Sequence, residues 1–220
     1  MVEKQAAAGQ KRNRAATEAR IRDAVGRVLA RDGFAGLGVG AVAKEAGVDK
    51  VLIYRYFGGL PELLRTFGEE SDVWPSVDEF AGGDLDALRA LGEGERLSQI
   101  LKNYGRRLRE RPITLEILAW ELIEQNELTE VLNERRVAVS DEMVDVLGET
   151  EAGSMPDLQA IYALLGAGQL LLALWARRRA TYGGIGIRTD EDLERIERAM
   201  DWLLAEVDST SVQPGSPRGD

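Results

Sequence analysis

The 220-residue chain contains no cysteine and no histidine. Without cysteine it can form no disulfide, which is compatible with a reducing cytoplasm. The two absences also exclude metal sites built from thiolates or imidazoles, catalytic triads that need a histidine and the Glu-x-x-His motif of di-iron helical bundles. We therefore expect a protein that is not an enzyme and that uses no metal or other cofactor.

Charge is unevenly distributed along the chain. The net charge of −10, taken alone, argues against a nucleic-acid partner. However, residues 1–68 hold 12 lysines and arginines against 7 acidic residues, whereas residues 69–220 hold 16 against 31. A basic head on an acidic body suits a protein that presents only one end to phosphates. The polar N-terminus lacks the apolar core of a signal peptide, so we expect a cytoplasmic protein.

Residues 38–57, GVGAVAKEAGVDKVLIYRYF, have the pattern of two short helices joined by a tight turn. Gly47 stands where a residue with positive φ commonly ends a helix. Asp49 can cap the second helix, because its carboxylate accepts the free N–H groups of the first turn. Ala43 is small enough for the two helix backbones to approach, and Ile53, with Val48, can close the small core between them. A helix-turn-helix of this kind puts its second helix in the major groove of DNA.

This stretch resembles the DNA-binding domain of the TetR/AcrR transcriptional regulators. The matching segments are Gly33-Phe34, Val42-Ala43, Ala46-Gly47-Val48, Lys50, Ile53-Tyr54-Arg55-Tyr56-Phe57 and Pro61-Glu62-Leu63-Leu64, after an amphipathic helix at 17–32. The resemblance implies a homodimer, a double-stranded DNA operator and a small-molecule inducer. The residues expected at the DNA are Gly38, Val39, Lys50, Val51, Leu52, Tyr54, Arg55 and Tyr56.

Three positions depart from the family's pattern. The family often has threonine where Gly38 stands, so only backbone N–H groups could contact a phosphate there. It often has Gly-Thr where Val51-Leu52 stand, and usually a lysine where Leu60 stands. The set of DNA contacts therefore does not carry over whole, and a helical hairpin packed for stability alone is the alternative reading of this segment.

The fold expected for the chain is all-α, because no segment alternates convincingly as a strand. We expect a disordered basic arm at 1–14, the helix-turn-helix domain at 15–60, a helical ligand-binding and dimerisation domain at 61–208, and a disordered tail at 209–220. The arm either follows the DNA backbone or stays solvated.

Within the large domain, helices are expected from Pro61 towards Trp74, from Asp84 to Arg111 with a break near Gly92, from Pro112, and at 127–147 and 157–180. Residues 75–83, 148–156 and 183–187 read as breaks or loops. Thr189 and Asp192 resemble a capping box that opens the last helix.

Two of the expected helices, the one at 160–176 and the last helix of the chain, are suited to a dimer interface. Residues 160–176, AIYALLGAGQLLLALWA, are apolar nearly all round, which indicates a helix buried on several sides or one that spans a membrane. The segment is shorter than the ~20 residues of a typical span. Two such helices from each chain would make a four-helix interface, and the alternative is an intramolecular core. The interface residues expected are Ile161, Leu165, Gly168, Leu172, Leu193, Ile196, Met200 and Leu203.

The remaining apolar residues suggest a ligand cavity, as the resemblance implies, or a plain core. The lining residues expected are Phe67, Tyr104, Leu108, Leu118, Trp120, Leu122, Tyr162 and Trp175. The function expected is that of a repressor that a small apolar ligand releases from a palindromic operator. The alternatives are a helical adaptor or ligand-binding protein that has lost DNA binding, and an enzyme that uses paired carboxylates such as Glu121 and Glu124.

Overall fold

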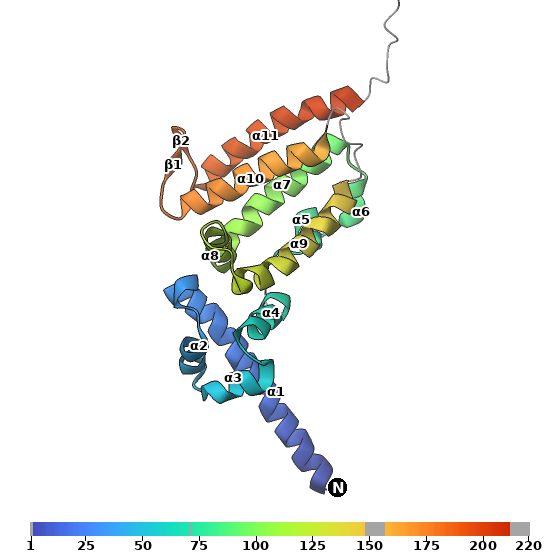
Figure 1. Ribbon diagram of the computed structural model, residues 1–220. Helices are drawn as coiled ribbons and strands as arrows, with labels where there is room; N and C mark the ends of the chain where they lie inside the picture. The colour runs from blue at the N-terminus through green and yellow to red at the C-terminus, as the bar shows by residue number, and fades with distance from the viewer. Residues whose placement is uncertain (1, 71, 148–156, 212–220) are drawn as a thin grey trace, which may run out of the picture. The chain divides into compact units, whose positions relative to one another are not determined.

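The computed structural model describes residues 2–70, 72–147 and 157–211 (Figure 1). The described chain is helical, as expected, except for one short hairpin. It divides into two compact units. The first unit comprises Met1–Trp74 and Pro112–Arg136, and the second comprises Pro75–Arg111 and Val137–Asp220.

The first unit contains α1 (Val2–Asp32), the short 3-10 helix η1 (Phe34–Gly36), α2 (Val39–Ala46), α3 (Lys50–Phe57), α4 (Leu60–Glu70), α8 (Pro112–Glu121) and the first half of α9 (Glu127–Leu147). The second contains α5 (Val77–Ala81), α6 (Leu85–Arg89), α7 (Glu93–Glu110), the rest of α9, α10 (Leu158–Ala176), β1 (Thr181–Tyr182), β2 (Ile185–Gly186) and α11 (Asp190–Ser211).

Helix α1 builds the core of the first unit, but it begins earlier than expected. Its buried stripe of Ile21, Val25, Val28 and Leu29 confirms the predicted amphipathic face. The prediction of a disordered arm at 1–14 is wrong from Val2 onwards, because the helix already starts there. The Ala-, Gln-, Lys- and Arg-rich composition of this segment favours a helix, and no proline interrupts it.

The boundary between the compact units differs from the one expected at residue 60. Leu63 and Leu64 of α4 are fully buried, so α4 belongs to the first unit. Helix α8 joins it from a distant part of the chain, because the Thr114 hydroxyl donates to the carbonyl of Val73. The ring of Trp120 also stacks on Phe34, with centroids 5.7 Å apart.

The second unit is organised around α7, along which α10 and α11 pack (Figure 1). Its core includes Ile100 and Leu101 of α7, Met143 of α9, Leu158 of α10 and Leu204 of α11. Helix α11 begins at a capping box as predicted, since Thr189 Oγ1 accepts from the Asp192 N–H at 3.2 Å and Asp192 Oδ2 accepts from the Thr189 N–H at 2.9 Å.

Two segments expected to be loops contain short regular elements. Helix α5 lies within 75–83, and Ser76 and Glu79 cap it reciprocally. Residues 181–186 form a hairpin in which Thr181 pairs with Gly186. Its turn residues Gly183 and Gly184 have φ of 57° and 83°, which suits a tight hairpin turn. The predicted break at 148–156 and the tail beyond 211 lie outside the described residues, but 209–211 belong to α11.

Candidate nucleic-acid interface

Helices α2 and α3 form the helix-turn-helix that the sequence predicts. Gly47 ends α2 with φ of 64° and ψ of 41°, a left-handed conformation that glycine adopts at little cost. The carboxylate of Asp49 accepts the N–H of Val51 at 2.8 Å and so caps α3. Ala43 and Ile53 are buried at the contact between the helices. The turn and the cap together fix the direction in which α3 leaves α2.

Helix α3 turns a mixed cationic and aromatic face to solvent. Lys50 and Arg55 are exposed, Val51 is 60% exposed and Tyr54 is 55% exposed. Lys50 and Tyr54 are four residues apart, as are Val51 and Arg55, so each pair shares a helix face. The phenol of Tyr54 therefore lies on the outer face of α3, while Ile53 fills the core.

The other residues expected at the DNA are less accessible. Gly38 caps α2 without a side chain, and its carbonyl accepts the N–H of Val42 at 3.0 Å. Gly38 and Val39 are half-buried at the start of α2, and Leu52 and Tyr56 are half-buried on α3. These four residues can therefore present only part of their surface to a partner.

One contact of α3 is not predicted from the sequence. The guanidinium of Arg14 lies 5.0 Å from the centre of the Tyr56 ring, within the range of a cation–π contact. Arg14 also pairs with Glu18 at 2.7 Å, and this hydrogen bond raises the pKa of Arg14. Because Arg14 belongs to α1, it links the first helix to α3. In the sequence, the one sign of this contact is that Arg14 lies in the basic N-terminal segment.

Helix α2 is tied to α1 by a small ion-pair network. Glu45 accepts from Arg31 at 2.5 Å and from Arg27 at 2.8 Å. The hydrogen bond from Arg31, followed by that from Arg27, lowers the pKa of the Glu45 carboxyl. The network joins α1 to α2 on the solvent-exposed side of α1, away from its buried stripe.

The family model for bacterial regulatory proteins of the tetR family matches residues 21–66, which include the whole of α2 and α3. Residues 21–66 therefore have the sequence of a tetR-family DNA-binding domain. No curated protein matches the sequence. A helix-turn-helix of the tetR type supports a DNA-binding transcriptional regulator.

Several solved structures share the fold. The fatty acid degradation regulator FadR from Bacillus halodurans is 21% identical with a TM-score of 0.55, over 86% of this chain and 94% of the other. A TetR-like regulator from Rhodococcus sp. RHA1 is 19% identical with a TM-score of 0.54, over 90% and 97%. Bacillus subtilis FadR, solved with stearoyl-CoA, is 18% identical with a TM-score of 0.51, over 84% and 96%.

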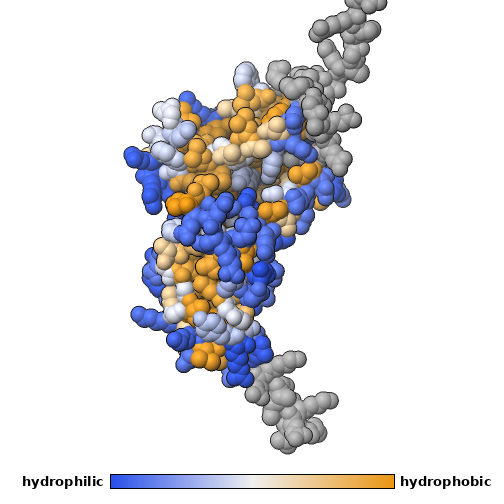
Figure 2. All heavy atoms as spheres, viewed as in Figure 1, coloured by the Kyte–Doolittle hydropathy of each residue, from blue (hydrophilic) through white to orange (hydrophobic). Residues whose placement is uncertain are grey.

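The residues expected at a dimer interface separate into exposed, buried and half-buried groups in the structure. Leu203 is 50% exposed, and Leu164 and Trp202 beside the expected set are about three-quarters exposed. Figure 2 shows such hydrophobic residues on the surface of the second unit. Met200, in contrast, is 5% exposed and belongs to the core of a single chain. The expected residues that are half-buried are Ile161, Leu165, Gly168, Leu172, Leu193 and Ile196.

The residues expected to line a ligand cavity fall in both units. Leu122 and Trp175 are largely exposed, at 73% and 43%. Tyr104 packs edge-on against Phe80, and burial raises the pKa of the Tyr162 phenol. In the first unit lie Phe67, Leu118, Trp120 and Leu122, and in the second lie Tyr104, Leu108, Tyr162 and Trp175. The structure thus distributes these residues over two units without defining one pocket from them.

The carboxylates considered for acid–base catalysis are engaged in local contacts. Glu121 accepts from Arg136 at 2.9 Å, and Glu124 accepts from the amide of Asn126 at 3.1 Å. Glu124 is fully on the surface, in the segment that connects α8 to α9. Glu121 is half-buried in its pair with Arg136, so the two carboxylates have separate partners and share no reacting centre.

Proposed function

We propose that the protein is a dimeric repressor that binds a palindromic operator through α3 and leaves it when a small, largely apolar ligand binds the second unit. The observation that carries the proposal is the exposed face of α3, where Lys50, Val51, Tyr54 and Arg55 are presented by a capped and rigidly joined helix. Cations and phenols suit phosphates and base edges, since phosphate contacts position a protein and base contacts give specificity.

A dimer is proposed because the second unit leaves large apolar side chains in water. Leu164, Leu171, Trp202 and Leu203 are all exposed on α10 and α11. Two copies related by a two-fold axis could bury this surface symmetrically. The same axis would place two α3 helices on two half-sites of a palindrome.

Helix α10 is the helix of the described chain that is long and apolar enough to cross a membrane, with a mean hydropathy of 1.6. Only 22% of that window is buried within one chain. We attribute the exposed remainder to the dimer interface, because the helix packs along α7 as part of the tetR fold. A soluble protein in the cytoplasm is therefore proposed.

The ligand class is proposed from the side chains of the second unit and from one protein of similar fold. Within the second unit, Leu108 and Tyr162 supply buried apolar surface. Bacillus subtilis FadR, which has a similar fold, was solved with stearoyl-CoA. Its long acyl chain makes stearoyl-CoA a reasonable first probe for this protein.

Footprinting with DNase I on DNA selected from a random library tests the proposal. We expect protection of two half-sites about one helical turn apart, and loss of protection when stearoyl-CoA or another long-chain probe binds. A protected site that no bound probe weakens would remove the ligand switch and leave a DNA-binding dimer. Failure to select any sequence would remove the repressor itself.

A helical adaptor without DNA binding is the second candidate, because specific residues favour it. Gly38 supplies no hydroxyl at the start of α2, and Leu52 and Leu60 stand where the family often has threonine and lysine. The same selection experiment separates the two candidates, since an adaptor would enrich no sequence.

A further inference from the structure

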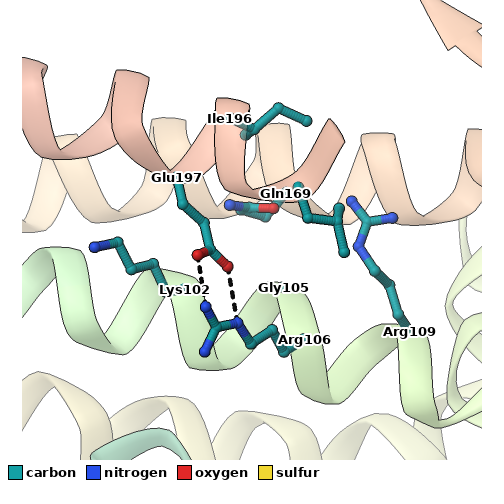
Figure 3. A pocket seen from close by; sticks show the side chains of 8 residues that line it. Lys102, Gly105, Arg106, Arg109, Gln169, Ile196 and Glu197 are labelled. Atoms are coloured by element: carbon teal, nitrogen blue, oxygen red, sulfur yellow. Dashed lines mark hydrogen bonds and ion pairs between the residues drawn. The ribbon is translucent and has the colours of Figure 1, made fainter. Parts of the chain in front are cut away.

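The face of α7 that is turned towards α10 and α11 carries three cations (Figure 3). Lys102, Arg106 and Arg109 follow one another at steps of four and three residues, so they share one face of the helix. They line a small pocket together with Gln169 of α10 and Glu197 of α11. Its other lining residues are Gly105, Leu193 and Ile196. The whole pocket lies within the second unit.

Two of the three cations have carboxylate partners. Lys102 Nζ lies 2.5 Å from Asp201 Oδ1. Arg106 forms a two-pronged pair with Glu197, with Nε and Nη2 donating to the two carboxylate oxygens at 2.8 and 2.6 Å. Figure 3 marks both of these bonds. These pairs tie α7 to α11 and neutralise their own charges.

Arg109 is different, because its charge is not neutralised. Its Nη1 donates to the carbonyl of Ile187 at 3.3 Å. Its Nη2 is buried and has no hydrogen-bond partner among the described residues. Glu197 is close enough to favour the Arg109 cation, but Arg106 already occupies both of its oxygens. Burial accordingly lowers the pKa of the Arg109 guanidinium.

Arg109 is half-buried with its Nη2 in the interior, where an uncompensated charge is costly and an anion would compensate it. A water molecule could accept from Nη2 but would leave the charge in place. The pocket encloses about 10 Å³, which is room for roughly one oxygen atom or one water. Gln169 adds an amide that donates only to the thioether of Met200, at 3.1 Å, which is a weak acceptor.

We propose that this pocket binds an oxyanion, a phosphate or a carboxylate, with one oxygen entering between α7, α10 and α11 and Arg109 as its main partner. Lys102 and Arg106, each paired with a carboxylate, line the pocket without adding net charge, and the rest of the anion stays in water. An anion there would bridge the helices that carry the exposed apolar surface. This site does not depend on the proposed DNA-binding function.

Titration of the full-length protein with inorganic phosphate or with acetate tests the proposal. Calorimetry would measure binding, and thermal unfolding would measure stability. We expect saturable binding of at least one of the two anions. At ten times the dissociation constant, the melting temperature should rise by about 4 °C. The preferred anion then distinguishes a phosphate from a carboxylate ligand.

The Arg109→Gln variant should lose at least tenfold in affinity for that anion. Arg89→Gln is the matched control, because Arg89 is an exposed arginine on α6 that lies outside the pocket. This control should bind the anion with the affinity of the parent. A change in its affinity would reveal a general effect of salt. Arg109→Met keeps the length of the side chain and serves as a second variant if the glutamine variant does not fold.

In anion-poor buffer both variants should melt close to the parent, because the lost hydrogen bond to the Ile187 carbonyl is offset by removal of an uncompensated charge. Saturable binding by the parent and its loss in the Arg109 variants would support the site. The absence of saturable binding of both anions by the parent would overturn the proposal. Equal binding by parent and Arg109→Gln would overturn it as well.

Discussion

The exposed faces of α3 and of α10 with α11 differ in chemistry and in how they are supported. The face of α3 carries Lys50, Tyr54 and Arg55 on a helix of eight residues, held by one buried side chain and one carboxylate cap. The α10 and α11 face carries Leu164 and Trp202 on helices of 19 and 22 residues.

The difference indicates two kinds of partner. A short polar face can leave its partner readily, because its contacts with phosphates exchange with water and counterions. A long apolar face favours a lasting partner, because exposing it to water again is costly. We therefore propose that reversible binding to DNA and stable pairing of two chains use separate surfaces.

The largest expected effect comes from opening a cavity in the core of the first unit. Leu64 is fully buried in the first unit, so Leu64→Ala should lower the free energy of unfolding by about 3 kcal/mol. Tyr54→Ala, on the exposed face of α3, should change it by less than about 0.5 kcal/mol. Urea unfolding monitored by circular dichroism measures both. Similar losses in the two variants would mean that Tyr54 is a packing residue.

The second effect concerns the apolar face. Leu203 is half exposed in one chain, so Leu203→Glu leaves each chain folded but places a charge in the proposed interface twice. We expect the dimer to weaken at least a hundredfold, or about 3 kcal/mol.

Sedimentation at micromolar concentration measures this change. Val137→Glu, on an exposed valine of α9, is the control and should sediment like the parent. A parent that is folded and monomeric would contradict the assignment of the α10 and α11 face to a second copy.

The smallest effect concerns the link between α1 and α2. The Glu45 carboxyl has a pKa below its ordinary value of 4.5 because Arg31 and Arg27 donate to it. A lowered pKa stabilises the fold above pH 4.5, and this stabilisation is lost as the pH falls through the folded-state pKa.

Glu45→Gln should therefore melt slightly lower than the parent at pH 7, and the difference should shrink at pH values well below 4.5. Thermal melts at several pH values measure it. Because the pair is exposed, the effect will be small. If the difference in melting temperature were the same at all pH values, packing and not the Glu45 charge would be its cause.

The sequence was sufficient to predict the local features of the fold. Gly47 and Asp49 define the turn because their chemistry acts on neighbouring backbone groups. The stripe beginning at Ile21 follows from helix periodicity alone. The first helix was cut short because polar and basic residues suggested a disordered arm, although their helix propensity supports α1.

Features that depend on distant contacts were not predictable. Thr114 and Trp120 join the first unit through Val73 and Phe34, and no local pattern indicates these contacts. Met200 lies on the predicted apolar stripe of α11, but periodicity cannot tell which neighbour a stripe faces. In the structure it faces Gln169 in the interior.

The central claim is that the exposed face of α3 binds operator DNA. The most direct measurement is the fluorescence anisotropy of a selected operator duplex, titrated at several salt concentrations with the parent, Lys50→Ala, Tyr54→Ala and the control Arg89→Ala. Lys50→Ala should bind about tenfold more weakly, and the slope of log affinity against log salt should fall by about 0.9. Tyr54→Ala should also bind more weakly, while Arg89→Ala should match the parent. If Lys50→Ala and Tyr54→Ala both bind like the parent, α3 is not the surface that reads DNA.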